Sequence, residues 1–413
     1  MNFDKVVEGS AVTIHSRGLE SLKRQNLISY LKELVNHQSI TPCDAGLIEM
    51  LAADLNSLGF EVDTFERNQV KNLIAKRHFG VGPTLAFSGH VDVVPARLEA
   101  WHTNPFEASI QGGIIYGRGT TDMKGGIAAM MSATRALISS RDDLSGTFYW
   151  LLTSDEEGEA ECGSKLIAER LKNDGIVLDA CLIGEPTSNH RVGDTIRNGR
   201  RGSISGSIQF TGKAGHVAYP EQTINSAHVA GQLIPRLLTI TWEKEPINTN
   251  LQITGINTST NLDNIVPDLC VVNFNIRYSH LYSSQEVIDK VKGVLSVDEK
   301  AFNLTWSRAC EPYSTPKRSD NCFLNLMEES IFENIDRFPL INTIGGTSDG
   351  RFFANGHTQV VECGVRNNSI HQANEHVSID DLIKIEQIYS SVLSKFFGKN
   401  DSSNCKNNQR SVE

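Results

Sequence analysis

Hydrophobic positions in the first half of the chain follow two alternating patterns, one typical of helices and one typical of buried strands. Apolar residues recur at every third or fourth position in four segments, which predicts helices over residues 26–35, 44–58, 124–139 and 163–173. Short apolar runs between them predict strands over residues 60–66, 72–76, 84–94, 147–153 and 180–183. Strands that alternate with helices favour an α/β domain whose mostly parallel central sheet is flanked by helices.

The pattern changes near residue 201, where strict alternation of apolar and polar residues begins. Such alternation is typical of half-exposed antiparallel strands. The predicted order is strand, helix, strand, strand, helix, strand, over residues 202–210, 224–238, 251–256, 269–278, 284–294 and 301–307. This order predicts a ferredoxin-like α+β domain. The α/β pattern then returns, with predicted helices over residues 323–335 and 379–397 and a strand over residues 359–365.

An α/β domain interrupted by an inserted α+β domain is the simplest interpretation of these patterns. We expect the α/β domain to comprise residues 20–200 and 311–398, and the inserted domain to comprise residues 201–310. The first 20 residues resemble a loosely held extension. Residues 399–413 are polar, aperiodic and rich in Ser and Asn, which predicts a disordered tail.

Composition and charge exclude several classes of protein. With 39% hydrophobic and 21% charged residues, the 413-residue chain is neither collagen-like, coiled-coil nor wholly disordered. Its net charge of −10 and the lack of any long basic run disfavour nucleic-acid and anionic-membrane partners. No apolar run approaches the roughly 20 residues of a membrane span, and the first 18 residues lack the apolar core of a secretory signal. Eight cysteines without a C-x-x-C pair favour free thiols, so we expect a cytoplasmic protein.

Acidic residues and histidines follow predicted strands, where ligands bind in open α/β sheets. They lie in five segments and comprise His90, Asp92, Asp122, the acids 155–157, Glu185 and His371. Taken singly, each has a structural alternative: a hydrogen-bonded histidine, a helix N-cap for Asp122, an acidic surface loop or a turn. The glycine-rich segment around Asp122 matches neither phosphate-binding motif, which disfavours a nucleotide site.

Taken together, the five segments indicate a single crevice that binds cations. Several carboxylates in one crevice would repel each other unless some were protonated or metal ions balanced their charge. A set of His, Asp and Glu ligands without a thiolate suits two Zn²⁺ ions, with Co²⁺ or Mn²⁺ as substitutes. Because side chains two positions apart in a strand face the same side, Asp92 is placed to hold the ring of His90.

These motifs resemble those of the co-catalytic zinc aminoacylase/carboxypeptidase superfamily, from about residue 26 to residue 397. The segments shared widely with that superfamily are SGHVDVVP, YGRGTTDMKGG and TSDEEG. The narrower segments IRNGRRGS, GKAGHVAYPE, GGTSDGRF and SIHQANE are similar to its desuccinylase branch. The resemblance implies a zinc-exopeptidase-like fold and an amide-hydrolysing activity.

The resemblance also implies a role for each residue of the cluster. One zinc would be held by His90 and Glu185 and the other by Glu157 and His371, with Asp122 shared between them. Glu156 would act as the general base, and Asp92 would support His90. A cis peptide bond is implied after Asp122.

For the inserted domain, the resemblance implies a homodimer in which His216 reaches the active site of the other subunit and stabilises the oxyanion. Seven further residues match positions that bind substrate in the superfamily. They are Arg200, Ser203, Tyr219, Asn264, Arg277, Gly346 and Thr347. Arg200 and Arg277 suit bidentate pairing with substrate carboxylates.

The implied reaction is hydrolysis of N-succinyl-LL-2,6-diaminopimelate to succinate and LL-2,6-diaminopimelate, a step toward lysine and peptidoglycan precursors. A related N-acyl amino acid deacylase, such as an acetylornithine deacetylase, is the alternative within the same class. An inactive binding protein on this fold is a second alternative, which the complete set of six site positions disfavours. A nucleotide-dependent transferase is a third, and it would require a cosubstrate.

Overall fold

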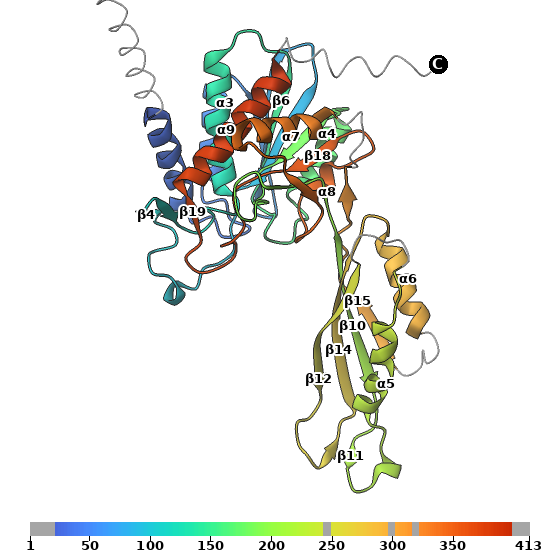
Figure 1. Cartoon of the computed structure of the whole chain (residues 1–413). Coiled ribbons are helices and arrows are strands. Elements are labelled where there is room, and N and C mark those ends of the chain that lie inside the picture. Colours follow the sequence, from blue (N-terminus) through green and yellow to red (C-terminus); the bar gives the residue numbers. More distant parts are fainter. Residues whose placement is uncertain (1–20, 243–248, 296–301, 316–321, 399–413) are drawn as a thin grey trace, which may run out of the picture. The chain divides into compact units, whose positions relative to one another are not determined.

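The structure is a computed structural model that describes residues 21–242, 249–295, 302–315 and 322–398. The predicted N-terminal extension and C-terminal tail lie outside these residues. The chain divides into two compact units (Figure 1). Unit 1 comprises Met1–Asn198, Thr315–Asn342 and Phe352–Glu413, and unit 2 comprises Gly199–Ser314 and Thr343–Arg351. Residues 343–351, expected from sequence within the α/β domain, therefore belong to unit 2.

Unit 1 contains an eight-stranded mixed sheet in the order β1-β2-β6-β3-β7-β18-β8-β17. Its strands are β1 (Glu61–Arg67), β2 (Val70–Gly80), β3 (Thr84–His90), β6 (Gly146–Thr153), β7 (Ala180–Ile183), β8 (Thr195–Arg197), β17 (Leu340–Asn342) and β18 (Gln359–Glu362). The four adjacent strands β6, β3, β7 and β18 run parallel. This confirms the predicted α/β fold with a mostly parallel central sheet.

Helices with one apolar face flank this sheet. Residues 21–36 are helical, followed by α2 (Leu47–Ser57), α3 (Lys124–Ser140), α4 (Ser164–Asn173), α7 (Cys322–Ile335) and α9 (Ile379–Phe397). The four-residue helix α8 (Gly350–Phe353) begins in unit 2 and ends in unit 1. In α9 the buried positions Leu382, Ile385, Tyr389 and Val392 repeat at helical spacing, and the Ser378 side chain caps the helix by accepting the Asp381 N–H. Helices α3 and α9 lie side by side and share one hydrophobic core with the sheet (Figure 1).

A small three-stranded sheet joins two loops that matter for function. It has the order β19-β5-β4, from β4 (Ser109–Gln111), β5 (Ile114–Tyr116) and β19 (His376–Ser378). Because β5 leads into the turn 117–122 and β19 follows the loop 363–375, their pairing brings that turn and that loop together. The short helix η1 (Leu98–Ala100) precedes β4.

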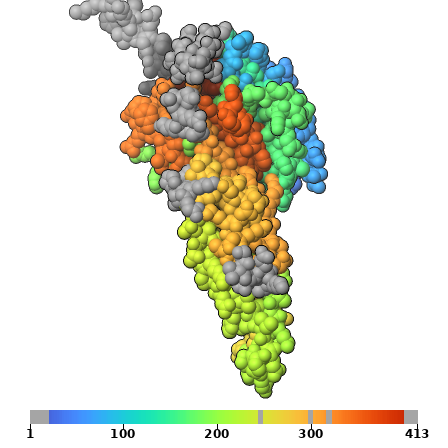
Figure 2. Space-filling view, turned by 90° about the vertical axis from the view of Figure 1, so that its right-hand side faces the viewer, coloured from blue at the N-terminus to red at the C-terminus, as the bar shows by residue number. Residues whose placement is uncertain are grey.

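Unit 2 is built on a four-stranded antiparallel sheet in the order β12-β14-β10-β15. Its elements are β10 (Gly202–Thr211), α5 (Ser226–Leu238), β12 (Asn250–Thr258), β14 (Leu269–Tyr278), α6 (Ser284–Leu295) and β15 (Phe302–Trp306). Chain order and sheet order are those of the predicted ferredoxin-like arrangement, which is confirmed. Both helices cover the same side of the sheet and form the surface of unit 2 that faces the viewer in Figure 2.

Short elements complete unit 2. They are the pair β11 (Gly215–His216) and β13 (Ile265–Val266), the pair β9 (Gly199–Arg200) and β16 (Tyr313–Ser314), and the helix η2 (Pro220–Gln222).

Two strands of unit 1 are shorter than predicted. Strand β3 ends at His90 and β18 ends at Glu362, whereas the predicted strands were 84–94 and 359–365. The apolar residues beyond these ends are buried in loops, for example Val91, Val93 and Val365, and this burial explains their hydrophobicity.

Candidate active site

Three neighbouring parallel strands of unit 1 deliver chemical groups to one edge of the sheet. His90 is the last residue of β3, Glu156 and Glu157 follow β6, and Glu185 follows β7. Because β6, β3 and β7 are adjacent and parallel, their carboxyl ends lie together, and the loops that follow them converge. Asp122 joins them from the turn before α3, and His371 from the loop between β18 and β19.

The buried imidazole of His90 contacts carboxylates from three loops. Its Nε2 atom lies 3.3 Å from Asp122 Oδ1, 3.3 Å from Glu185 Oε1 and 4.0 Å from Glu156 Oε2. Its Nδ1 atom is 2.9 Å from the main-chain oxygen of Asp92 and 3.5 Å from the Asp92 carboxylate. The ring of His90 is therefore held by the Asp92 carbonyl, with the carboxylate as a more distant partner, and Nε2 faces the cluster.

The second imidazole, His371, contacts two of the acids. Its Nε2 atom lies 2.9 Å from Glu157 Oε1 and 3.3 Å from Asp122 Oδ2. Asp122 therefore presents one oxygen to each imidazole. A carboxylate between two such nitrogens is placed as a bridging ligand of two cations would be.

The Asp92 carboxylate also fixes the loop that carries the two glutamates. It accepts the main-chain N–H of Glu157 at 3.1 Å and that of Glu156 at 3.4 Å. Asp92 is fully buried, so the surrounding protein atoms hold its carboxylate in place. The carboxylate of Asp92 thereby positions both glutamates.

Charge is crowded in this cluster, and the pKa values show it. Burial and Asp122 together raise the pKa of Glu185 to about 7, although His90 opposes the shift. Hydrogen bonds to Asp122 and Glu157 raise the pKa of His371 to about 10. Burial disfavours a charged His90, but Asp122, Asp92 and Glu185 outweigh it and raise its pKa well above 6.5. These protein groups thus attract positive charge strongly.

The donor set fits divalent cations. Ligand atoms of His90, Glu156 and Glu185 lie within 4.8 Å of one another, and so do those of His90, Asp122 and Glu157. Imidazole nitrogens and carboxylate oxygens without thiolates suit Zn²⁺, Co²⁺ or Mn²⁺. Glu156, predicted as a base, is thus close enough to His90 and Glu185 to compete as a ligand.

Two further residues that the motifs did not single out support the turn 117–122. Glu375 accepts N–H groups of this turn, and the buried Lys124 ammonium donates to the carbonyls of Leu34 and His37, each at 2.9 Å. The sequence carried no signal for either role, because most of their partners are main-chain atoms and all of them lie far away in the chain. The peptide bond between Asp122 and Met123 is cis, as the resemblance implied.

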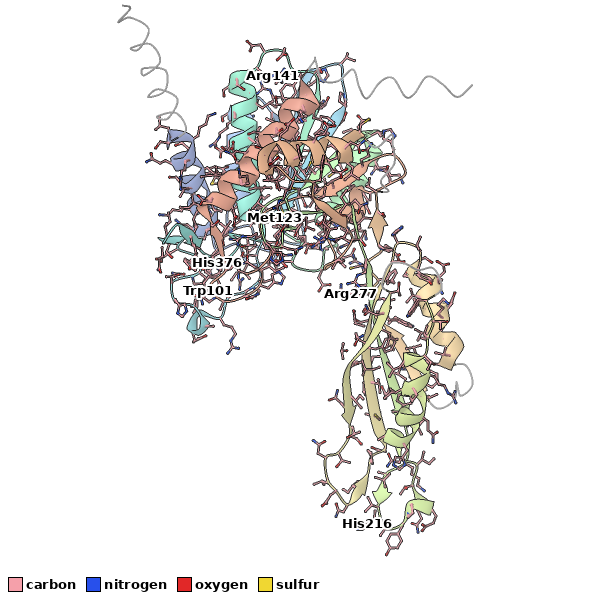
Figure 3. All side chains as sticks on the ribbon, viewed as in Figure 1. Trp101, Met123, Arg141, His216, Arg277 and His376 are labelled. Carbon is pink, nitrogen blue, oxygen red and sulfur yellow. The ribbon has the colours of Figure 1, made fainter. Side chains whose placement is uncertain are left out.

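Close packing around Met123, labelled in Figure 3, explains two glycines of the site motifs. A Cβ atom at Gly89 would meet the Met123 Cε atom at 2.4 Å, and one at Gly184 would meet it at 2.6 Å. Both contacts are with the terminal methyl of a flexible side chain, but a Cβ atom at Gly184 would also meet Phe87 Cζ at 2.8 Å. Met123 therefore packs directly beside the residues that precede His90 and Glu185.

The residues predicted to bind substrate all lie in unit 2, where they form two separate groups. His216, Tyr219 and Asn264 gather near β11 and β13: the two rings are 5.9 Å apart, and the Val217 N–H donates to the Asn264 carbonyl at 3.2 Å. Arg200, Ser203, Arg277, Gly346 and Thr347 form the other group. There Ser203 pairs with Arg277 across the sheet, and Arg200 Nη1 donates to the Gly346 carbonyl at 3.5 Å. His216 and Arg277 lie at opposite ends of unit 2 (Figure 3).

The fold and the cluster of unit 1 define a metal-dependent hydrolase. Residues 86–395 match the profile of peptidase family M20/M25/M40, and the chain belongs to that family. It is 44% identical over 373 residues to succinyl-diaminopimelate desuccinylase 1 of Alteromonas mediterranea, covering 89% of this chain and 95% of the relative. It is 39% identical to succinyl-diaminopimelate desuccinylase 2 of Shewanella loihica, covering 89% and 99%. The resemblance inferred from the motifs is confirmed.

Solved structures with lower identity share the fold. An M20 family metallo-carboxypeptidase from Sulfolobus solfataricus matches with a TM-score of 0.75 at 17% identity, over 89% of this chain and 98% of that chain. A dinuclear metal binding peptidase of the M20 family from Bacillus subtilis matches with a TM-score of 0.66 at 15% identity, over 90% and 98%. Among the helices that the structure describes, none combines the length and the hydrophobicity that a membrane-spanning helix requires.

Proposed function

We propose that this protein hydrolyses N-succinyl-LL-2,6-diaminopimelate to succinate and LL-2,6-diaminopimelate, as a cytoplasmic step toward lysine and peptidoglycan precursors. One observation carries the proposal: a complete cluster of two imidazoles and four acids converges in a chain that is 44% identical over 373 residues to a desuccinylase. The segments IRNGRRGS and GGTSDGRF support the same substrate, because they carry the positions that resemble its binding residues.

The cluster would hold two zinc ions, with cobalt or manganese as substitutes. His90 and Glu185 would hold one ion, and Glu157 and His371 would hold the other. Asp122 would be shared, because its Oδ1 atom lies 3.3 Å from His90 and its Oδ2 atom lies 3.3 Å from His371. When bound, the two cations would polarise the amide carbonyl and make the attacking water more acidic. The raised pKa values of His90 and His371 support this assignment, because they reflect a negative potential that cations would balance.

Glu156 would move the protons of the reaction. In this assignment its carboxylate accepts a proton from the attacking water and later delivers it to the leaving amine. Its main-chain N–H is held by Asp92, so the position of the base depends on a buried carboxylate that is itself fixed beside His90. Asp92 would thus position both the base, Glu156, and the ligand, His90.

Substrate recognition would draw on unit 2 of two copies of the chain. Arg200 and Arg277 suit the carboxylates of the substrate, and His216 would stabilise the oxyanion. Since His216 and Arg277 lie at opposite ends of one unit, a second copy would supply His216. Exposed apolar side chains around His216 support a homodimer through unit 2. They are Val217, Tyr219, Leu262 and Ile265.

A direct assay tests the proposed function. The purified full chain, supplied with Zn²⁺, is offered N-succinyl-LL-2,6-diaminopimelate and N-acetylornithine in parallel, and release of succinate or acetate is followed. We expect a clear preference for the succinyl substrate in kcat/KM, without any requirement for ATP or acyl-CoA. A preference for N-acetylornithine would instead establish the related deacylase activity.

A further inference from the structure

A single buried carboxylate links the turn that carries Asp122 to the loop that carries His371. Glu375 Oε1 accepts the main-chain N–H of Thr121 at 2.9 Å and that of Asp122 at 3.1 Å. Glu375 Oε2 accepts the N–H of Gly119 at 3.0 Å and Arg118 Nη1 at 2.8 Å. Four donors thus converge on two oxygens, and three of them are main-chain groups of one short turn.

These contacts constrain the turn more than an ordinary ion pair would. Glu375 is 1% exposed and Arg118 is 3% exposed, so water does not compete for their hydrogen bonds. Arg118 also donates to the carbonyl of Gln372 at 3.2 Å and to that of Pro95 at 3.4 Å. Main-chain N–H groups of one turn that surround an anion form a concave anion-binding site, and here Glu375 supplies the anion.

The geometry connects Glu375 to both imidazoles of the cluster. Asp122 donates its main-chain N–H to Glu375. One of its side-chain oxygens lies 3.3 Å from His90, and the other lies 3.3 Å from His371. His371 precedes Glu375 by four residues in the same loop. One carboxylate therefore fixes the shared acid and, through its own loop, the more exposed of the two histidines, whose side chain is 50% exposed.

We propose that Glu375 is a positioning residue for the cation pair: it sets the orientation of the Asp122 carboxylate and the place of His371, and thereby the affinity for divalent cations. The proposal rests on the proposed cation site and deepens it. Glu375 itself holds no cation here, because each of its oxygens already accepts two N–H donors. Its contribution is to build the site, since partners behind metal ligands affect affinity strongly.

The test replaces one acceptor by a donor. In Glu375→Gln, the amide nitrogen would face two N–H donors that now bind a carboxylate oxygen, while size and shape stay nearly the same. The metal-free full chain is titrated with Co²⁺ and followed by visible absorption, which reports affinity and coordination directly and needs no turnover. We expect about 10- to 100-fold weaker binding of Co²⁺ and an altered absorption spectrum.

A matched control separates positioning from general loss of stability. Asp194 likewise accepts three main-chain N–H groups, from Asn189, His190 and Arg191, at 2.9, 2.8 and 2.9 Å, in the loop between β7 and β8. Its contacts include none of the cluster residues. Asp194→Asn is therefore expected to lower thermal stability while it leaves the affinity for Co²⁺ unchanged.

Three results for the variants would overturn the proposal. Wild-type Co²⁺ affinity in Glu375→Gln would overturn it, and so would an equal loss of affinity in Asp194→Asn. If Glu375→Gln does not fold, Glu375→Asp takes its place: it keeps the charge but shortens the reach, and unchanged affinity there would also overturn the proposal. A wild-type chain that binds no Co²⁺ would overturn the cation site itself, whereas a wild-type chain that binds two ions isolates the role of Glu375.

Discussion

Glu156 and Glu157 are neighbours in the chain, but their side chains have different surroundings. Glu157 Oε1 lies 2.9 Å from His371 Nε2, within hydrogen-bonding distance, whereas Glu156 Oε2 lies 4.0 Å from His90 Nε2. The shorter contact suits a cation ligand. The difference supports separate roles as ligand and base.

Replacing the base is the sharpest test of that separation. We expect Glu156→Ala to lower kcat by about 10²- to 10⁴-fold or more, because general-base catalysis is lost, while the content of bound metal stays at the wild-type level. Metal content is measured by elemental analysis of the protein after gel filtration. The exposed Glu159 nearby provides the control, and Glu159→Ala should retain activity. Loss of metal in Glu156→Ala would instead identify Glu156 as a ligand, as its proximity to Glu185 permits.

At the residue scale, the sequence indicates the members of the cluster better than the residues that support them. Acids and histidines in the loops of the α/β pattern predicted that His90, Asp122, Glu157, Glu185 and His371 converge, and their roles as ligands stay predictions from the resemblance. Glu375 was not predictable, because its partners, three main-chain N–H groups and the Arg118 side chain, lie about 250 positions earlier. Main-chain donors have no identity in a sequence, so only the folded chain places them around a carboxylate.

At the scale of elements, the start of α3 depends on close contact with the end of β7. A Cβ atom at Gly126 would meet the carbonyl oxygen of Gly184 at 2.5 Å, and that backbone atom cannot move aside without shifting Glu185. We expect Gly126→Ala to destabilise the fold by about 1–3 kcal/mol through overpacking and to weaken cation binding. Urea unfolding and Co²⁺ titration measure the two effects.

Gly231, within α5, is the matched control for this substitution. A Cβ atom there would meet nothing within 4 Å, so Gly231→Ala should be neutral or stabilise by about 0.5–1 kcal/mol, as alanine restricts the unfolded chain. Equal destabilisation in both variants would contradict the argument from close contact and would point to a general intolerance of alanine in these helices.

The loop between β7 and β8 depends on the ionised form of Asp194. Burial alone would raise the pKa of Asp194, but N–H groups of Asn189, Arg191 and His190 stabilise the carboxylate and lower its pKa below 3.8. Because the folded pKa is depressed, the stabilisation is fully present above the unfolded pKa of about 3.9 and is lost as pH falls through the folded value.

This sign predicts a pH-dependent effect of Asp194→Asn. At pH 7 the variant should be less stable than the wild type by about 1 kcal/mol or more, since charge-assisted hydrogen bonds are lost. Below about pH 4 the difference should shrink, because the wild-type carboxylate is then protonated as well. Thermal unfolding at several pH values measures the difference, and a difference that does not change with pH would count against this role of the carboxylate.

Elements with a repeated or continuous apolar signal were predictable from sequence, and the shortest ones were not. Helix α9 and strand β14 have the predicted bounds because each repeats its apolar positions often enough to define a period, and the four-residue strand β7 has them because its apolar run is uninterrupted. Strands β8 and β17 have three residues each and were missed. Three residues cannot establish a period. These two strands are defined by their pairing instead, because β8 pairs with β17 and also with β18.

At the scale of the whole molecule, the proposed exchange of His216 between two copies predicts complementation. His216→Ala and Glu156→Ala should each be nearly inactive, because one loses the oxyanion donor and the other the base. After the two variants are mixed, unfolded and refolded together, one site of each mixed dimer has both residues. With random pairing in a twofold dimer, about a quarter of wild-type activity should return.

Titration of one variant with the other, followed by activity at constant total protein, measures this recovery. Absence of recovery, although an affinity tag on one variant co-purifies the other variant, would place His216 and Glu156 of one active site in the same copy. A mixture of His216→Ala with wild-type chain serves as the reference for dilution.

The sheet order β7-β18-β8 has a consequence for synthesis in the cell. The ribosome makes β18 only after it has made all of unit 2. Until then the nascent chain presents β7 with an unpaired edge, and α3 lacks its neighbour α9. Open strand edges and uncovered apolar helix faces promote aggregation. We therefore expect a chain truncated before β18 to aggregate more readily than the full chain.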